Sequence, residues 1–237
     1  MIRIIVKSSR ILFAFILLMP ILLSAQQDSV RIKKIKYTND FKFTDGIFMN
    51  IEEVKRNKPI SKARIISDLN YDDYAFFEKI LMNDHFVVLD QMGLRKEIKS
   101  KDIWGFSQNG ILYIYWNKEF NRIPVFGTIS HFIADKTYTQ QNNNYNNNYN
   151  NSYYNPYNPY YPSSTSTTKT ELRQYILDME TGNVINYTYQ NIEIILMRDA
   201  KLYEEFIKLK KKQRKQLKFL YLRKYNEKHP FYIHQEY

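Results

Sequence analysis

Apolar, β-branched and aromatic residues gather in several short runs bounded by polar turn residues, a pattern typical of β-strands. The clearest example lies within 102–134. There, 103–106 is followed by Asn109-Gly110, a pair that favours the positive φ values of a type I′ hairpin turn. The β-branched and aromatic run 111–116 comes next, and 123–134 continues as a third strand. The pattern therefore predicts an antiparallel meander.

A second hairpin is predicted around the turn Glu180–Asn183. Gln174–Leu177 and Val184–Tyr189 have the composition of its two strands. Four more short strands are predicted at 32–37, 47–49, 63–66 and 86–89.

Helical spacing follows Asn50, which has an N-cap composition and an acid three residues later. The stretch 71–81 fits either a short helix or an irregular chain. The C-terminal part, 191–228, has apolar residues at helical spacing, with Asn191 and Asp199 placed to cap two of its helices. Together these elements predict an α+β fold: an antiparallel meandering sheet with short helices and a basic C-terminal helical segment.

The first 25 residues have the layout of a secretory signal peptide. Arg3, Lys7 and Arg10 precede the apolar run Ile11–Leu23, and the small residues Ser24-Ala25 follow. An uncleaved membrane anchor is the alternative, but this run is shorter than the roughly 20 residues that a spanning helix needs. We therefore expect cleavage after Ala25 and export to the periplasm, the cell surface or the medium. The mature chain, 26–237, suits a single domain.

The positive charge of the chain is concentrated near its C-terminus. The 237 residues carry a formal charge of +11, and removal of the three leader cations leaves +8. The segment Lys201–Lys228 alone holds eleven Lys or Arg against three Glu, which is also +8. Because the remainder is near neutral, charge is a local property of this segment and points to a local role.

The densest part of this segment is the candidate anion-binding surface. Its members are Lys208, Lys210, Lys211, Lys212, Arg214, Lys215 and Lys218. An exported protein meets envelope polyanions, acidic polysaccharide and anionic lipid, so these are the partners expected, including peripheral contact with a membrane; nucleic acid is not expected. The alternative is that the run forms an ordinary solvated helix face.

A low-complexity tract interrupts the predicted strands. Residues 140–162 comprise ten Asn, seven Tyr, three Pro, two Gln and one Ser, without a charged or aliphatic side chain, and 163–168 extend the tract with Ser and Thr. Such a composition cannot build a core, so a disordered insertion is expected at 140–168. The alternative is an adhesive segment, because Tyr rings stack on sugars and Asn amides bond to polar groups.

No motif in the chain specifies a reaction. The chain has no cysteine, which excludes disulfides, thiolate metal sites and a cysteine nucleophile. The spacing of His229 and His234 does not match a helical zinc pair, and Ser130, next to His131, points to the opposite strand face. The acids Asp72, Asp73, Asp84 and Asp90 have no diagnostic spacing. We expect no cofactor, no metal and no catalytic residue.

The order of features resembles small secreted proteins of unassigned function from Bacteroidota. The matching segments are Asp-Gly-Ile-Phe-Met-Asn-Ile-Glu-Glu at 45–53, Ile-Trp-Gly-Phe through Asn-Gly at 103–110, and Tyr-Asn-Glu-Lys-His-Pro at 225–230. The resemblance implies export and an α+β domain, and it implies no catalytic residue. We expect a non-enzymatic binding or structural protein of the envelope. A hydrolase of envelope or extracellular polymers is the alternative, and it would need a cleft with convergent polar groups.

Overall fold

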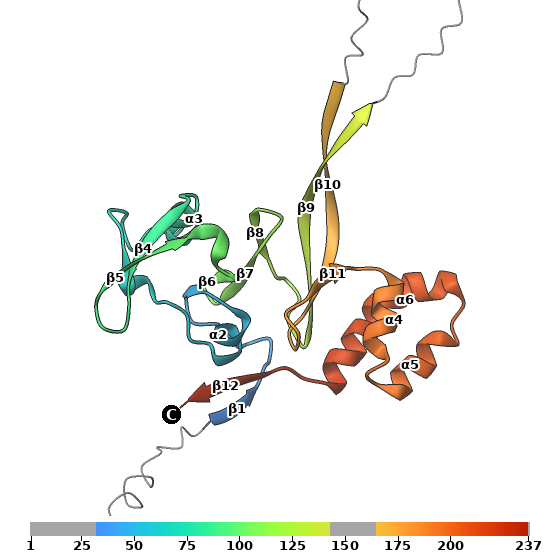
Figure 1. The fold of residues 1–237 in the computed structure, drawn as a ribbon. Coiled ribbons are helices and arrows are strands. Elements are labelled where there is room, and N and C mark those ends of the chain that lie inside the picture. Colours follow the sequence, from blue (N-terminus) through green and yellow to red (C-terminus); the bar gives the residue numbers. More distant parts are fainter. Residues whose placement is uncertain (1–31, 143–164, 237) are drawn as a thin grey trace, which may run out of the picture. The chain divides into compact units, whose positions relative to one another are not determined.

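The computed structural model describes residues 32–142 and 165–236, and within these ranges the fold is α+β, as predicted (Figure 1). The proposed signal peptide, 1–25, and the central tract, 143–164, lie outside the described residues. Residues 34–234 form one compact unit. The first and last described strands, β1 (Ile32–Lys36) and β12 (Tyr232–Glu236), form a two-stranded sheet.

A four-stranded antiparallel sheet contains the predicted Asn-Gly hairpin. Its strands, in spatial order, are β2 (Gly46–Phe48), β6 (Gly105–Gln108), β7 (Ile111–Trp116) and β8 (Glu119–Arg122). Asn109 and Gly110 have φ values of 53° and 76°, which confirms the turn. The predicted third strand, 123–134, is wrong in its bounds. Asn117 and Lys118 also have positive φ and form a tight turn, so the return strand β8 starts earlier than expected.

The region between β2 and β6 forms a separate three-stranded sheet and two short helices. Its elements are α2 (Ile51–Arg56), the 3₁₀ turn η1 (Lys62–Arg64), β3 (Ile65–Ile66), α3 (Phe76–Leu81), β4 (His85–Leu89), β5 (Arg95–Lys99) and the 3₁₀ turn η2 (Ser100–Asp102). Asn50 caps α2 through its Oδ1, which accepts from the Glu53 amide at 3.0 Å, as predicted. Strand β5 was not predicted, because only Ile98 among its five residues is buried.

The longest strands are β9 (Ile129–Asn142) and β10 (Thr165–Asp178), which form the twisted hairpin in Figure 1. Strand β11 (Val184–Asn186) adds to β10 and confirms the second predicted hairpin, but it ends three residues earlier than predicted, because Tyr189 already begins a helix. The ladder pairs Asn142 with Thr165. Residues 140–142 and 165–168 are therefore paired strand, although their composition assigned them to the insertion, since Thr and Gln backbones can extend a ladder that is already in register.

The β9–β10 hairpin separates two hydrophobic clusters. Phe132 and Tyr175 face a cluster shared with β7 and α2, whereas Ile176 faces a cluster shared with the C-terminal helices. Because adjacent residues on a strand point to opposite faces, one stretch of chain supplies both cores. A third cluster lies between α3, the β3–β4–β5 sheet and Phe106 of β6.

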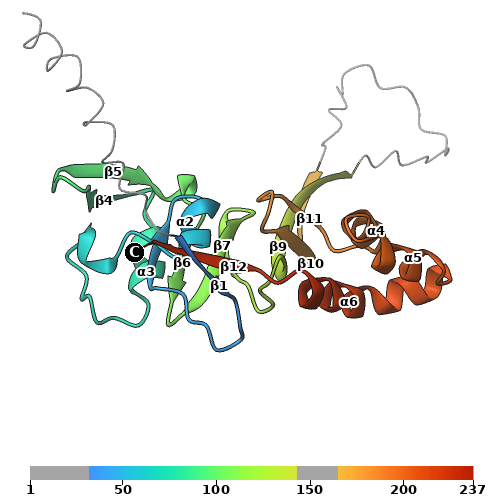
Figure 2. The same cartoon turned by 90° about the horizontal axis from the view of Figure 1, so that it is seen from below.

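Three helices follow the sheets: α4 (Tyr189–Leu196), α5 (Ala200–Ile207) and α6 (Lys211–Lys228), which pack on one another (Figure 2). Asp199 caps α5 as predicted, through a 3.1 Å bond from the Leu202 amide. The predicted cap Asn191 is wrong, because Thr188 caps α4 and accepts from the Asn191 amide at 3.2 Å. No helix in the described ranges has the length and apolar character needed to cross a bilayer.

Candidate functional site

The predicted basic surface lies at the start of α6. Lys210 is the N-cap residue, and its amide donates to Gln213 Oε1 at 3.0 Å. The first turn of α6 has no acidic residue, and Lys211, Lys212, Arg214 and Lys215 all lie within its first five positions. The amino end of a helix carries a partial positive charge, so these cations are placed where the helix dipole disfavours them.

Two of the seven predicted anion-binding residues are committed to the interior of the helical part. The Arg214 guanidinium pairs with Glu193 of α4 at 2.6 Å and lies 5.4 Å from the centre of the Tyr189 ring. Lys218 Nζ donates to the Tyr187 carbonyl at 2.9 Å and lies 3.9 Å from the centre of the Tyr187 ring. Burial lowers the pKa of Lys218. Arg214 thus links α6 to α4, and Lys218 links α6 to the segment just before α4.

The other five predicted residues remain available. Lys208, Lys210, Lys211, Lys212 and Lys215 are all exposed, and none of them forms an ion pair with a described residue. The neighbouring acids of α4 and α5 are used elsewhere: Glu193 pairs with Arg214, and Glu205 pairs with Lys224 at 3.3 Å. The only exposed carboxylate of α5 without a described cationic partner is Glu204. The surface is therefore strongly positive, and five lysines define it.

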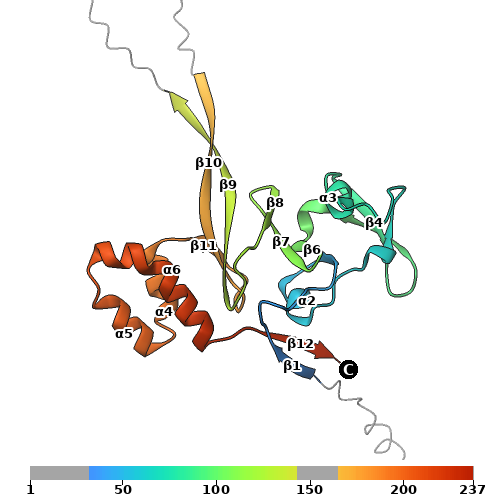
Figure 3. The ribbon, with the colours of Figure 1, turned by 180° about the vertical axis from the view of Figure 1, so that it is seen from behind.

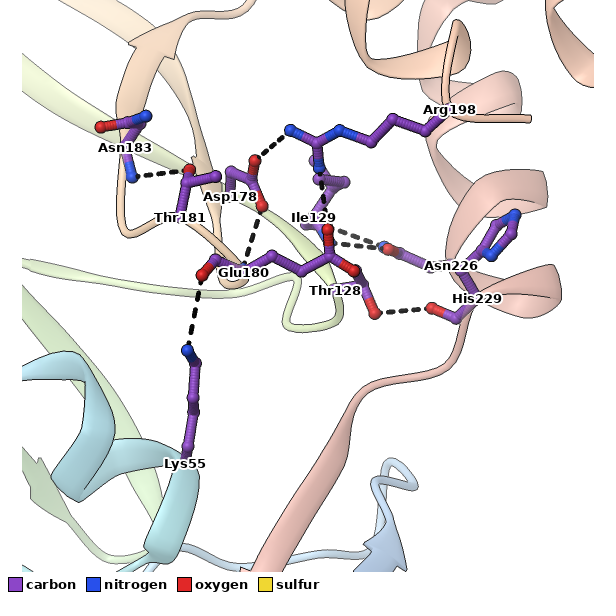
Figure 4. Close-up of polar contacts among 10 residues, drawn as sticks. All are labelled: Lys55, Thr128, Ile129, Asp178, Glu180, Thr181, Asn183, Arg198, Asn226 and His229. Carbon is purple, nitrogen blue, oxygen red and sulfur yellow. Dashed lines mark hydrogen bonds and ion pairs between the residues drawn. The ribbon is translucent and has the colours of Figure 1, made fainter. Parts of the chain in front are cut away.

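The segment 225–230 attaches α6 to the base of the β9–β10 hairpin. In the Asn226 side chain, Nδ2 donates to the Ile129 carbonyl and Oδ1 accepts from the Ile129 backbone amide, both at 2.8 Å (Figure 4). Thr128 Oγ1 donates to the His229 carbonyl at 2.6 Å. A Cβ at Gly127 would lie 2.7 Å from Asn226 Nδ2, so this close approach requires glycine. The segment is a structural link.

Asp199, the N-cap of α5, binds the last residue of α6 and the residue after it. Its carboxylate accepts from the Leu202 amide, from Lys228 Nζ at 2.6 Å and from His229 Nε2 at 2.7 Å. The hydrogen bond from Lys228, followed by that from His229, holds the pKa of Asp199 well below its usual range. The His229 ring is half-buried against this carboxylate.

A second carboxylate cluster braces the hairpin turn against α4. Arg198 pairs with Asp178 at 2.5 Å and with Glu180 at 3.2 Å, and Lys55 Nζ reaches the Glu180 carbonyl at 3.5 Å (Figure 4). Burial raises the pKa of Asp178, but the hydrogen bonds from Arg198 and the Glu180 amide outweigh it, so the pKa lies below its usual range. This cluster also has a structural role.

The residues that a serine hydrolase would need are not assembled around His131. Its ring meets Gln174 Oε1 at 3.2 Å and packs edge-on against Tyr187, while burial lowers its pKa. Ser130 is fully buried on the opposite face, where its Oγ donates to the Gly127 carbonyl at 3.1 Å. His131 is thus a half-buried sheet residue, and Ser130 points to the opposite face, as predicted.

Two of the four acids singled out in the sequence, Asp73 and Asp90, accept hydrogen bonds from nearby backbone amides. Asp73 accepts from the Ala75 amide at 2.8 Å, and Asp90 accepts from the amides of Met92 and Leu94 at 2.8 Å. The described residues contain no cluster of three or more His, Asp or Glu side chains that could hold a metal ion.

One cleft of about 830 Å³ lies between α3, β4 and the β7–β8 turn. It was not predicted, because its walls come from segments far apart in the chain. Its ionisable side chains are Glu78, Asp84, His85, Lys99, Lys101, Tyr115, Lys118 and Glu119. Among these described side chains no hydrogen bond or ion pair joins one to another.

Comparison of the chain with protein-family models, with curated proteins and with solved structures finds no match in any of the three.

Proposed function

We propose that this is an exported, non-enzymatic binding protein that attaches to polyanions of the cell envelope through the start of α6. One observation carries the proposal: five exposed lysines gather around one helix end without a described acidic partner. Such a patch raises the local concentration of anionic groups and binds them through charge. Acidic polysaccharide and anionic lipid headgroups share this chemistry.

The position of the lysines supports a binding role over an ordinary solvated face. A helix start is stabilised by acids and destabilised by cations, by about 0.3–1 kcal/mol for each exposed charge. The sequence places Lys211, Lys212 and Lys215 there and no acid in the first turn. Departures from local folding preference are expected at functional sites, where binding compensates for the lost stability.

The proposal is tested by removing only the available charges. Replacing Lys208, Lys210, Lys211, Lys212 and Lys215 by Gln leaves Arg214 and Lys218 in their structural roles and preserves helix propensity. Binding of residues 26–237 to a soluble acidic polysaccharide and to phosphatidylglycerol-rich vesicles is measured at increasing NaCl. We expect the wild type to bind at least one of the two and to weaken steeply with salt, and the variant to bind at least about tenfold more weakly.

A charge-matched control separates a specific surface from net charge. The control variant replaces five exposed cations of β5, η2 and the β7–β8 turn by Gln: Arg95, Lys96, Lys99, Lys101 and Lys118. We expect this control to bind like the wild type. Equal loss in both variants, or no binding by the wild type, would contradict the proposal.

The cleft near α3 is the observation that favours the alternative function, a hydrolase of extracellular polymers. That function requires purified protein to release soluble fragments from envelope polysaccharide. It also requires the release to depend on Asp84 or Glu119, the carboxylates on opposite walls of the cleft. Binding without release supports the non-enzymatic proposal.

A further inference from the structure

The outer face of α6 exposes apolar side chains among its cations. Phe219 is 40% exposed and Leu220 is 46% exposed, whereas the next two residues, Tyr221 and Leu222, are buried against α4 and α5. The helix therefore has apolar residues on both faces, and only the face that carries Tyr221 and Leu222 is buried. In Figure 3 the same helix is seen from behind, beside α4 and α5.

Cations flank the exposed ring along the helix. Lys215, Phe219 and Arg223 are spaced four residues apart, so their side chains follow one another along one face of α6. Lys212 lies one turn before Lys215 on the same side, and all three cations are exposed. Glu227, near the end of the helix, is the exposed carboxylate of this face.

The apolar surface continues from α6 onto the β9–β10 hairpin. The Phe219 ring lies 6.1 Å from the His131 ring, and Ile133, two residues along the same strand face, is 47% exposed. Leu172 of β10 occupies this face as well and is 76% exposed. Asp135, opposite Leu172, is the carboxylate here, so the positive potential is strongest at α6.

We propose that the partner of this surface is a lipid bilayer with anionic headgroups. The inference rests on the proposed polyanion binding and narrows it to one class of polyanion. A soluble acidic polysaccharide is held mainly by charge, and the exposed aliphatic side chains of Leu220, Ile133 and Leu172 would add little to its binding. At a bilayer, Phe219 and Leu220 enter the boundary between headgroups and acyl chains, while Lys212, Lys215 and Arg223 contact lipid phosphates.

The decisive experiment removes the apolar side chains and keeps the charge. Phe219→Gln with Leu220→Gln is compared with Ile194→Gln and Met197→Gln, which remove two even more exposed apolar side chains, at 57% and 56%, from α4 and its C-cap. Binding is measured to phosphatidylglycerol-rich vesicles, to phosphatidylcholine vesicles and to a soluble acidic polysaccharide. We expect the α6 variant alone to bind the anionic vesicles about tenfold more weakly, with unchanged binding to any polysaccharide that the wild type binds.

A reporter variant detects insertion directly. In Phe219→Trp, the indole emission should shift to the blue on addition of anionic vesicles and be quenched by lipids brominated on their acyl chains. The native Trp104 and Trp116 contribute a background that the wild type measures. Thermal unfolding of each variant confirms that the contact between Phe219 and His131 is not required for folding.

The outcomes separate the two proposals. Binding to polysaccharide but not to anionic vesicles overturns the bilayer inference and leaves polyanion binding intact. Equal vesicle binding by wild type and the α6 Gln variant, or binding to phosphatidylcholine as tight as to phosphatidylglycerol, also overturns it. If the wild type binds neither vesicles nor polysaccharide, the proposed function itself is contradicted.

Discussion

In the C-terminal part, the role of a side chain can be predicted from the sequence when its partners are local, and not when they lie on another helix. Asp199 was predictable as a helix cap, because an acid before Ala200 and an apolar stripe is a local signal. The inward roles of Arg214 and Lys218 were not predictable. The partner of Arg214, Glu193, lies 21 residues away on another helix, and only the packing of the helices brings the two together.

Asn226 offers the most direct test of the link between α6 and the hairpin. Asn226→Ala leaves both the amide and the carbonyl of Ile129 without their partner. We expect a loss of about 2–4 kcal/mol in the free energy of unfolding, since each unpaired buried group costs about 1–3 kcal/mol. Urea unfolding measures it. Asn39→Ala, at an exposed turn, is the control and should change stability by less than about 0.5 kcal/mol.

His131 makes stability depend on pH. Burial lowers its folded-state pKa below the ordinary value of about 6.5, so the unfolded chain binds the proton more readily. Stability is then fully present above about pH 6.5 and falls as the pH drops through the folded pKa. Urea unfolding at pH 7.5 and pH 5.5 should show a smaller loss in His131→Gln than in the wild type. An equal loss in both would show that other groups dominate.

Among helices and strands, the sequence predicted those whose pattern is local. The Asn109-Gly110 hairpin and the helix after Asn50 follow from turn and cap chemistry alone. Strand β5 escaped prediction because four of its five residues are exposed and charged, so it has no apolar period. The bounds of β8 were missed because Asn117 and Lys118 form a positive-φ turn without glycine.

The start of α6 should show a conflict between helix stability and binding. Lys211→Glu with Lys212→Glu places acids in the first turn, where the helix dipole favours them by about 0.3–1 kcal/mol each. We expect thermal unfolding to move to higher temperature while polyanion binding falls by more than in the corresponding Gln variant. A variant that is more stable and still binds would refute the proposed role of these lysines.

Across the larger structure, the division into three hydrophobic clusters was the least predictable property. A sequence signal for it is the run 129–134, which has apolar residues on both strand faces: Ile129 and Ile133 on one, Phe132 and Ala134 on the other. Such a run is typical of a strand that is buried on both faces. The candidate surface on α6 was predicted as a charged run, but its exposed Phe219 and Leu220 emerged only once the buried face was known.

Shortening the hairpin tests whether the Asn/Tyr tract contributes to folding. Deleting 143–164 and joining Asn142 to Thr165 through a short Asn-Gly turn keeps the whole described ladder. We expect the midpoint of thermal unfolding to change by less than about 4 °C, because closing a longer loop costs little free energy. A decrease of more than about 8 °C, on the order of 2 kcal/mol, would show that the tract packs on the folded chain.

The base of the β9–β10 hairpin contributes to two cores, and this has a consequence for the length of the Asn/Tyr tract. A slip of one residue in the ladder would exchange Phe132 with its neighbours and place the wrong side chains in both cores at once. The register is thereby fixed at the base, and the distal end has no part in fixing it. The fold therefore allows this tract to change in length between generations without altering the pairing on which the cores depend.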